Sequence, residues 1–511
     1  MKITIARMAS WLQHVSAHLP ACLLALFAGW TGTFAGGAWG DSAALGHGAL
    51  LVFVALYGRL GAAPSELGRR GGWLLAAFGT SLLASYLLSP VERAGRLGLL
   101  LLPAFLLVPS AVAGCWATVE QRRLGLRSWS LVVTGVAGWA LFGWWQLETP
   151  RAALPLGHHN LLAAWLVITL PLAALSWREG GPGRILSGVA VLTGSAALLG
   201  TGSLGAALAV AAVGASLVLR TAWTAADAHR RRLWVASAIV VGLLLVQMPR
   251  LRQIAAGADF SATARWSYLE AGWRGLQHRP VFGWGPGAAS WTISEHLRPI
   301  PGVHPPDQVV ADLHCWPLQV AYEVGWSGLL LGLGLAVVFL RSRRSEAADP
   351  DLRRCALLGL AALGVVSTTG LSLAVSALPL AVVVALGAVL AAEQRSPPEP
   401  RSVGPRIAAV VAACVIGVCV LPLDRAHLAY DRAMSGLDRS QQIRHLRRAV
   451  ELDPAFPLYQ ARLAWLEAEN GLGEPAVARR ALAAAEAARG LAPLWLAAGL
   501  HGQQAGEAWA S

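Results

Sequence analysis

Arginine and histidine side chains are concentrated in residues 249–315, a polar stretch between two apolar runs. Its six arginines include Arg265, Arg274, Arg279 and Arg298, and its histidines are His278, His296, His304 and His314. Five acidic residues nearly cancel the arginine charge, so anion binding here must depend on locally placed arginines. A guanidinium stays protonated and offers paired donors to phosphate, and an imidazole accepts a proton near neutral pH. The stretch therefore has the residue types for binding a phosphorylated substrate and transferring a proton.

The elements that position this stretch are predicted membrane spans. Of the 511 residues, 55% are hydrophobic and 14% are charged, against about 25% charged in an average soluble domain. Apolar runs of roughly 16 to 22 residues have the length that crosses the hydrocarbon core of a bilayer. We expect about thirteen spans, near residues 19–37, 47–63, 71–89, 97–117, 129–147, 159–176, 185–201, 204–219, 233–248, 316–340, 355–371, 374–392 and 407–423. The sequence thus predicts an all-α, polytopic integral membrane protein.

Arginine placement predicts the orientation, because basic residues near the ends of spans are retained in the cytoplasm. Short loops on one side hold 20 arginines, and short loops on the other side hold three. This asymmetry favours an uncleaved, cytoplasmic N-terminus over the alternative, a signal peptide cleaved near Ala35. It also explains the net charge of +13 through cytoplasmic loops, without nucleic-acid binding. The C-terminus and residues 249–315 are then expected on the outer side.

Two domains are expected, a transmembrane domain over residues 1–423 and a water-soluble helical domain over residues 424–511. In the second domain ten arginines are balanced by ten acidic residues. A short pattern occurs twice in it, 39 residues apart, as Ala449, Leu452 and Pro454 and then as Ala488, Leu491 and Pro493. Short helices closed by a proline resemble tetratricopeptide repeats, and an unrelated small helical domain is the alternative. A repeat domain predicts a protein partner.

A longer pattern covers the polar stretch and the span that follows it. It reads ARWSYLEAGWRGLQHRPVFGWGPGAASW from Ala264 and DLHCWPLQVAYEVGWSGLLL from Asp312. This order of residues resembles the O-antigen ligase and polymerase superfamily of bacterial membrane glycosyltransferases. The matching positions are Arg265, Pro280, Gly283, Gly285, His314, Leu318, Gln319, Glu323, Gly325 and Gly328. GHHNLLAAWLVITLPL from Gly157 also resembles a family span, with Asn160 as the matching asparagine.

The resemblance implies transfer of a glycan from undecaprenyl pyrophosphate to an acceptor hydroxyl at the periplasmic face of the inner membrane. It implies no nucleotide sugar, metal or other cofactor. The acceptor is lipid A core, another glycan or a protein, so ligation, polymerisation and protein glycosylation stay open. A transporter is the alternative from another class, but it predicts mid-span charges that these spans lack. A degenerate membrane scaffold is a further alternative.

Catalytic roles are expected for two residues of the pattern. Arg265 is expected to stabilise negative charge on the leaving pyrophosphate, and His314 to act as a base or to orient the acceptor. Substrate binding is expected from Arg279, Arg151, Asn160, Gln319, Glu323, Gly283 and Gly285. For the two glycines, a tight backbone turn is the alternative to holding phosphate with their amides. The remaining arginines and histidines of the stretch are expected to be solvated or to lie at the membrane surface.

Two positions depart from the family pattern. Leu204 stands where the family often has an arginine, and Cys315 stands where it commonly has an asparagine. The missing arginine removes one phosphate contact, which Arg151 or another arginine must replace if the substrate is held in the same way. A metal site built from His158, His159 and His314 is a weaker alternative, because the sequence shows no matching carboxylate or cysteine spacing.

Overall fold

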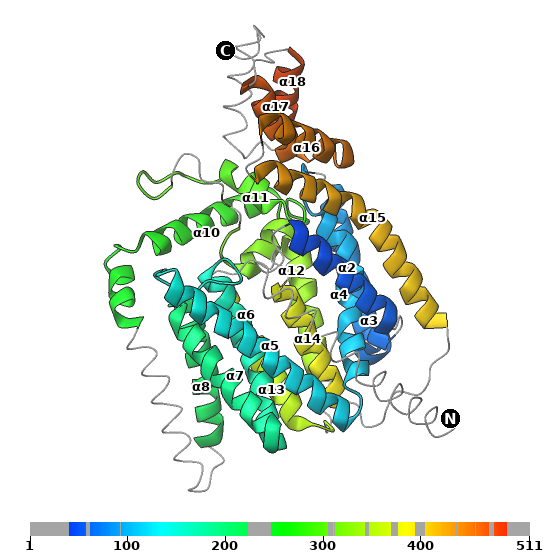
Figure 1. The fold of residues 1–511 in the computed structure, drawn as a ribbon, viewed down its shortest axis with the longest axis vertical. Helices are drawn as coiled ribbons and strands as arrows, with labels where there is room; N and C mark the ends of the chain where they lie inside the picture. Colours follow the sequence, from blue (N-terminus) through cyan, green and yellow to red (C-terminus); the bar gives the residue numbers. More distant parts are fainter. Residues whose placement is uncertain are drawn as a thin grey trace.

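The computed structural model describes residues 40–57, 62–91, 94–222, 247–304, 310, 312–342, 347–368, 377–393, 404–435, 438–454, 456–469 and 475–487. Within these ranges the chain forms helices joined by turns and irregular segments, with no strand. Most of the helices stand as a bundle, and the C-terminal helices extend from one end of it (Figure 1). The predicted all-α architecture is confirmed.

The long helices of the bundle are α2 (Gly40–Tyr57), α3 (Ala62–Leu87), α4 (Arg96–Cys115), α5 (Val119–Gln146), α6 (His159–Leu175), α7 (Gly181–Gly200), α8 (Leu204–Ala222), α12 (Trp316–Ser342), α13 (Pro350–Ser367), α14 (Ala377–Glu393) and α15 (Gly404–Met434). Two helices, α10 (Phe260–His278) and the short α11 (Ala289–Thr292), belong to the loop before α12. The C-terminal helices are α16 (Arg439–Leu452), α17 (Pro457–Glu469) and α18 (Pro475–Ala487).

Six of the described helices are long and apolar enough to cross a membrane. They lie in α4, α5, α6, α7, α12 and α15, and three shorter apolar helices lie in α3, α8 and α14. The chain is therefore a polytopic membrane protein, as predicted. The expected spans at 19–37 and, apart from its last two residues, at 233–248 lie outside the described residues. The count of about thirteen spans stays a prediction.

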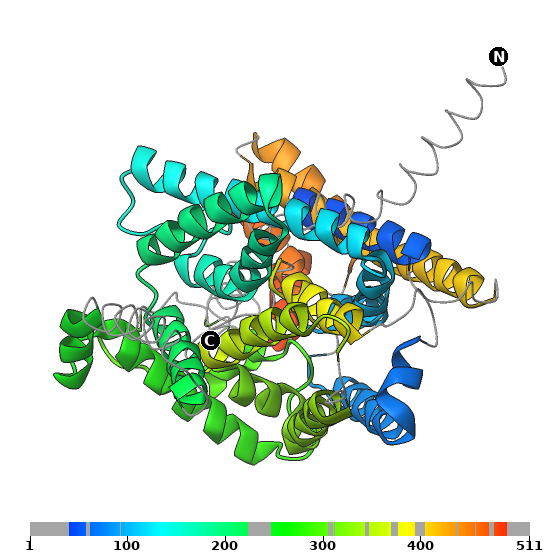
Figure 2. The same cartoon turned by 90° about the horizontal axis from the view of Figure 1, so that it is seen from below.

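Burial follows the chemistry expected of a bundle in lipid. Large side chains such as Trp129 and Trp165 are fully buried between helices, while Trp145 and Val418 are 76% and 74% exposed. Exposed apolar side chains are stable only against hydrocarbon, so these outer faces are lipid-facing. Inside, α2 and α15 run side by side (Figure 2) and are joined by a buried contact of 2.9 Å between His47 Nδ1 and Asp424 Oδ1.

The C-terminal helices contact the loop that precedes α12. The ring of Phe456, between α16 and α17, meets the ring of Trp291 in α11 edge-on at 5.5 Å. Val91 packs in the same small apolar cluster. Residues 249–315 and the C-terminal helices therefore lie on the same side of the bundle, as the arginine asymmetry requires. The second half of the expected repeat, residues 488–493, lies outside the described residues, so the repeat stays a prediction.

This contact leads to a topology prediction. In a chain without other cysteines, Ser290→Cys and Ser440→Cys are each expected to react with a membrane-impermeant thiol reagent in cells whose outer membrane has been permeabilised. Glu120→Cys, in the arginine-rich first turns of α5, is the control and is expected to react only after the inner membrane is broken. Protection of either serine position in intact inner membranes would overturn the orientation.

Candidate functional site

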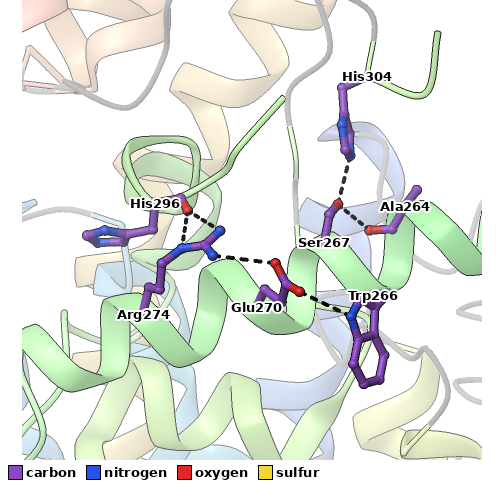
Figure 3. Close-up of polar contacts among 7 residues, drawn as sticks. All are labelled: Ala264, Trp266, Ser267, Glu270, Arg274, His296 and His304. Carbon is purple, nitrogen blue, oxygen red and sulfur yellow. Dashed lines mark hydrogen bonds and ion pairs between the residues drawn. The ribbon is translucent and has the colours of Figure 1, made fainter. Parts of the chain in front are cut away.

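The segment α10 is held in place by charged and hydrogen-bonded ends. The Asp259 carboxylate caps α10 by accepting the Ala262 amide at 2.9 Å, and it also pairs with Arg250 at 3.1 Å. α10 then lies crosswise to the bundle helices (Figure 1). Figure 3 shows two contacts between α10 and the loop that follows α11. Arg274 donates to the His296 carbonyl, and Ser267 Oγ lies 2.8 Å from His304 Nε2.

The His304 ring is neutral in this arrangement. Its Nδ1 accepts the Ile300 amide, so the ring proton lies on Nε2 and is donated to Ser267 Oγ, while Ser267 donates to the Ala264 carbonyl. Burial lowers the pKa of His304, which favours this neutral form. At this contact the loop is thus fastened to α10 by neutral groups.

A cavity of about 640 Å³ lies between α10 and the segment before it, the start of α6, and the segment before α12. This volume suits a small-molecule site. Its lining residues are Arg151, His158, His159, Asn160, Pro249, Arg250, Gln253, Asp259, Phe260, Ser261, Ala264, Arg265, Tyr268, Val303 and His314. Three arginines face a single carboxylate in this lining, so the cavity carries a positive charge.

The three cavity arginines differ in their partners. Arg250 is neutralised by Asp259. The Arg265 guanidinium makes no hydrogen bond or ion pair with any residue that the structure describes. Arg151 donates to His159 Nε2 at 2.9 Å, which leaves its charge uncompensated and shows that this histidine nitrogen acts as an acceptor. Arg265 and Arg151 are therefore the cations available to an anionic ligand.

His314 is held in a conformation that few residues adopt. Its φ is +51°, in the left-handed region, and its amide donates to Asp312 Oδ1 at 2.8 Å. Its ring stacks near Tyr268, and its Nδ1 lies 3.2 Å from the same Asp312 oxygen. Burial lowers the pKa of His314, Asp312 raises it and Arg265 lowers it again, and the result is below the ordinary value. His314 is thus a neutral imidazole whose Nδ1–H faces a carboxylate and whose Nε2 is left to accept a proton.

The start of α6 supplies the other polar wall. His158 caps this helix by accepting the Asn160 amide at Nδ1, and burial, His314 and Arg265 lower the pKa of His158. Asn160 Oδ1 accepts the hydroxyl of Ser203 at the start of α8. The side-chain nitrogen of Asn160 takes no part in this hydrogen bond, so it can donate to a ligand in the cavity.

Four of the nine predicted site residues line this cavity, namely His314, Arg265, Arg151 and Asn160. The other five, Arg279, Gln319, Glu323, Gly283 and Gly285, do not line it. For the four in the cavity, the predicted roles remain hypotheses that the geometry allows.

The family model described as O-antigen ligase matches residues 189–333. Over these residues the chain is similar to the O-antigen ligase family. The predicted resemblance is confirmed over this segment, and it brings with it a general function in ligation or polymerisation of lipid-linked glycans at a bacterial membrane. No curated protein is similar enough to the chain to count as a match.

The matched O-antigen ligase segment contains Arg250, Arg265 and His314, whereas Arg151 and Asn160 precede it. The cavity is therefore built jointly by the matched segment and by the earlier helix α6. No three His, Cys, Asp or Glu side chains gather as a metal site among the described residues, so His158, His159 and His314 do not form the weaker alternative site there.

The five remaining predicted residues form a junction between the loop and α12. Gly325 interrupts α12 with a φ of +75°, so the carbonyls of Tyr322 and Glu323 lose their helical partners. The amides of Trp284 and Gly285 donate to these carbonyls at 2.9 and 2.8 Å. The Gly283 amide donates to the Arg279 carbonyl. Because both glycine amides are already bonded within the protein, the structure favours the tight-turn alternative over holding phosphate.

Arg279 is also occupied at this junction. Its guanidinium donates to the Leu88 carbonyl at 2.8 Å and lies over the Trp284 ring at 4.8 Å from the ring centroid. The side chain thus fixes the turn to the end of α3 and is not directed to the cavity lining.

Gln319 and Glu323 connect this junction to His314. Glu323 accepts the Gly287 amide through one carboxylate oxygen and the Gln319 side-chain amide through the other. The Gln319 oxygen accepts the amide of Leu313, the residue before His314. A line of hydrogen bonds therefore runs from the glycine turn to the backbone of the candidate base, and these two side chains act as positioning residues.

The sequence interpretation missed several residues that line the cavity or contact its lining. Arg250 was assigned to the membrane surface, although its spacing of nine residues from Asp259 was available as a signal for an ion pair. Asp312 lies two residues before His314, a spacing that suggests an orienting carboxylate. Tyr268 carries no signal apart from its position one helical turn after Arg265.

The break in α12 yields a prediction on stability. At Gly325 an added Cβ would lie 2.0 Å from the Val281 carbonyl oxygen and would force a side chain into the left-handed region. Gly325→Ala is expected to cost on the order of 2 kcal/mol or more, seen as a lower unfolding temperature of the purified protein. Gly332→Ala in the same helix is the control, because its nearest neighbour would be 3.6 Å away. Equal unfolding temperatures for the two variants would contradict this account of the junction.

Proposed function

We propose that this protein transfers a glycan from undecaprenyl pyrophosphate to an acceptor hydroxyl at the periplasmic face of the inner membrane. The observation that carries the proposal is the pairing, in one cavity, of two cations without carboxylate partners and a His–Asp pair. The family match supports the lipid-linked glycan as donor class. The family match alone supports a function of ligase or polymerase type and does not specify the exact donor or acceptor.

Arg265 and Arg151 are proposed to bind the pyrophosphate. As the bond between the sugar and the pyrophosphate breaks, its electron pair leaves with the lipid pyrophosphate, and negative charge grows on the phosphate oxygens. Fixed guanidinium donors in a partly buried site stabilise that charge in the transition state. Arg151 approaches the turn before α8, within 3.7 Å of where a Cβ of Gly202 would lie. It is thus placed to supply the cation that Leu204 lacks.

His314 is proposed to take the acceptor proton. Its Nε2 accepts the hydroxyl hydrogen while the acceptor oxygen forms the new bond to the anomeric carbon. Asp312 holds the Nδ1–H and stabilises the imidazolium that results. Tyr268 and the Gln319 hydrogen bond to Leu313 keep the ring and its backbone in place. The proton later passes from His314 to solvent, which restores the neutral base.

Three classes of acceptor fit this reaction: lipid A core, another glycan or a protein hydroxyl. Helices α16 to α18 sit against the loop that carries the site, so a partner bound to them would lie beside α11. This placement favours a role for the C-terminal domain in contact with a protein partner. The scaffold alternative predicts that changes in the cavity leave product formation untouched.

Removal of Arg265 tests the charge proposal. Arg265→Ala is expected to lower transfer from purified undecaprenyl-pyrophosphate glycan by about 10² to 10³ while expression and membrane insertion persist. Arg265→Lys is expected to recover only part of the rate, because the planar pair of donors is lost. Arg298→Ala, an exposed arginine of the same loop outside the cavity, is the matched control and should keep full activity. Wild-type turnover by Arg265→Ala would remove this residue from the site.

The pH dependence tests the base. Because the pKa of His314 is lowered, the neutral ring persists below about pH 6.5, and transfer should decline only as the pH drops through that lowered pKa. Asp312→Asn removes the charge that raises this pKa, so its decline is expected at still lower pH, with a smaller maximal rate. His314→Gln should lose about 10²-fold or more. A flat pH profile in single-turnover assays, together with high activity of His314→Gln, would leave His314 with positioning alone.

A further inference from the structure

A second basic cavity lies away from the O-antigen ligase site, between α15 and α16. Its volume is about 390 Å³, and its lining consists of Arg425, Leu428, Ala429, Arg432, His445, Arg448 and Leu452. None of these residues lines the cavity of the candidate site, and none is acidic. The groove thus combines an apolar floor with a rim of three arginines and a histidine.

The spacing of these residues shows that two helix faces build the groove. Residues 425, 428, 429 and 432 follow the three-four spacing of one face of α15, and residues 445, 448 and 452 do the same on α16. The two faces meet along their length because α16 folds back against α15 (Figure 1). The arginines of the two helices therefore converge on one space.

The charge in this groove is largely uncompensated. The guanidinium groups of Arg425 and Arg432 form no ion pair or hydrogen bond with any residue in the described part of the chain. Arg448 is paired with Glu451 at 2.9 Å, but both side chains are more than half exposed, so this pair contributes little and exchanges readily. Elsewhere in the C-terminal helices Arg447 and Arg480 share the Glu467 carboxylate, and Arg439 is paired with Glu469. An anion is the ligand that this rim fits.

The position of the groove along α15 indicates where that anion comes from. Val418 and Leu421 are 74% and 55% exposed, as expected for side chains that face hydrocarbon. Arg425 follows Leu421 by four residues, about 6 Å along the helix axis. The headgroup layer is roughly 5 to 7 Å thick on each side of the hydrocarbon core, so Arg425 reaches the phosphate level of the membrane. Arg432 lies about 10 Å further along the axis and closes the outer end of the groove.

We propose that the groove between α15 and α16 binds the phosphate-bearing headgroup of an anionic membrane lipid. The arginine rim takes the phosphate through charge-assisted hydrogen bonds, and the floor of Leu428, Ala429 and Leu452 takes the apolar part next to it. A free phosphate ion would use the rim but would gain nothing from the floor. Such a lipid would fix the angle at which the C-terminal helices leave the membrane. The inference does not depend on the proposed glycan transfer.

The test is direct lipid binding by the full chain in a nonionic detergent, with phosphatidylglycerol as the probe. Arg425→Gln combined with Arg432→Gln is expected to weaken binding by about tenfold or more, because each arginine at a membrane surface contributes roughly fivefold. Arg444→Gln combined with Arg462→Gln removes the same charge from exposed positions outside the groove and is the control. The control should bind as the wild type does. Matching unfolding temperatures of the two double variants would exclude a folding defect.

Two further probes separate the sources of the anion. Phosphatidylcholine, whose headgroup is neutral overall, should bind at least tenfold more weakly than phosphatidylglycerol, and millimolar inorganic phosphate should fail to displace the lipid. Equal loss of binding in both double variants would show a general charge effect and overturn the proposal. Complete displacement by inorganic phosphate, or equal binding of the two lipids, would also overturn it.

Discussion

The structure depends on how the backbone groups freed at the break in α12 are satisfied. In a membrane protein an unpaired carbonyl or amide costs several kcal/mol, and water is not available within the bilayer to pair it. At Gly325 the chain turns into the left-handed region, and the loop 280–287 enters the break to donate and accept the missing hydrogen bonds. Pro280 accepts the Trp326 amide on the far side of the same break. The loop and the helix therefore cannot be positioned independently of each other.

Helix α3 supplies the hydroxyls that complete this junction. Ser85 donates to the Glu323 carbonyl and Ser89 to the Trp284 carbonyl, while Ser81 bonds to Ser327. Ser81 and Ser85, four residues apart, lie on one face of α3 opposite the break, and Ser89 lies just after the helix ends. Most hydrogen bonds of this junction are formed by neutral hydroxyl and backbone groups. The junction is therefore rigid, and the arginines of the candidate site take no part in it. The ionisable side chains there are Glu323, which is hydrogen bonded through both oxygens, and Arg279, whose guanidinium is held by the Leu88 carbonyl.

Hydropathy predicted most of the fold because spans are determined by local composition. The expected spans at 97–117, 159–176 and 316–340 correspond to α4, α6 and α12, with shifts of a few residues. Helix α5 begins ten residues before its expected span, at Val119, since the capping box of Thr118 and Gln121 starts the helix within the arginine-rich loop. Capping depends on polar residues, to which a hydropathy scan is insensitive.

The candidate site was only partly predictable, for a physical reason. Arg265 and His314 were found because a motif orders them along the chain, and Arg151 and Asn160 came from the same resemblance and an arginine count. The motif does not distinguish residues that contact a ligand from residues that hold the frame. Gly283, Gly285, Gln319 and Glu323 belong to the frame, because their hydrogen bonds end within the protein. That distinction requires knowing which carbonyls α12 leaves unpaired, and this follows from the three-dimensional path of the chain.

The distribution of carboxylates helps to separate sites from framework. Arg127 is paired with Glu179 and Arg353 with Glu393, whereas Arg265 and Arg425 have no carboxylate partner among the residues that the structure describes. Uncompensated charge lowers the stability of a fold unless a ligand supplies the counter-charge. Arg265 and Arg425 each line a cavity, and these two cavities are where an anion from the membrane is expected to bind.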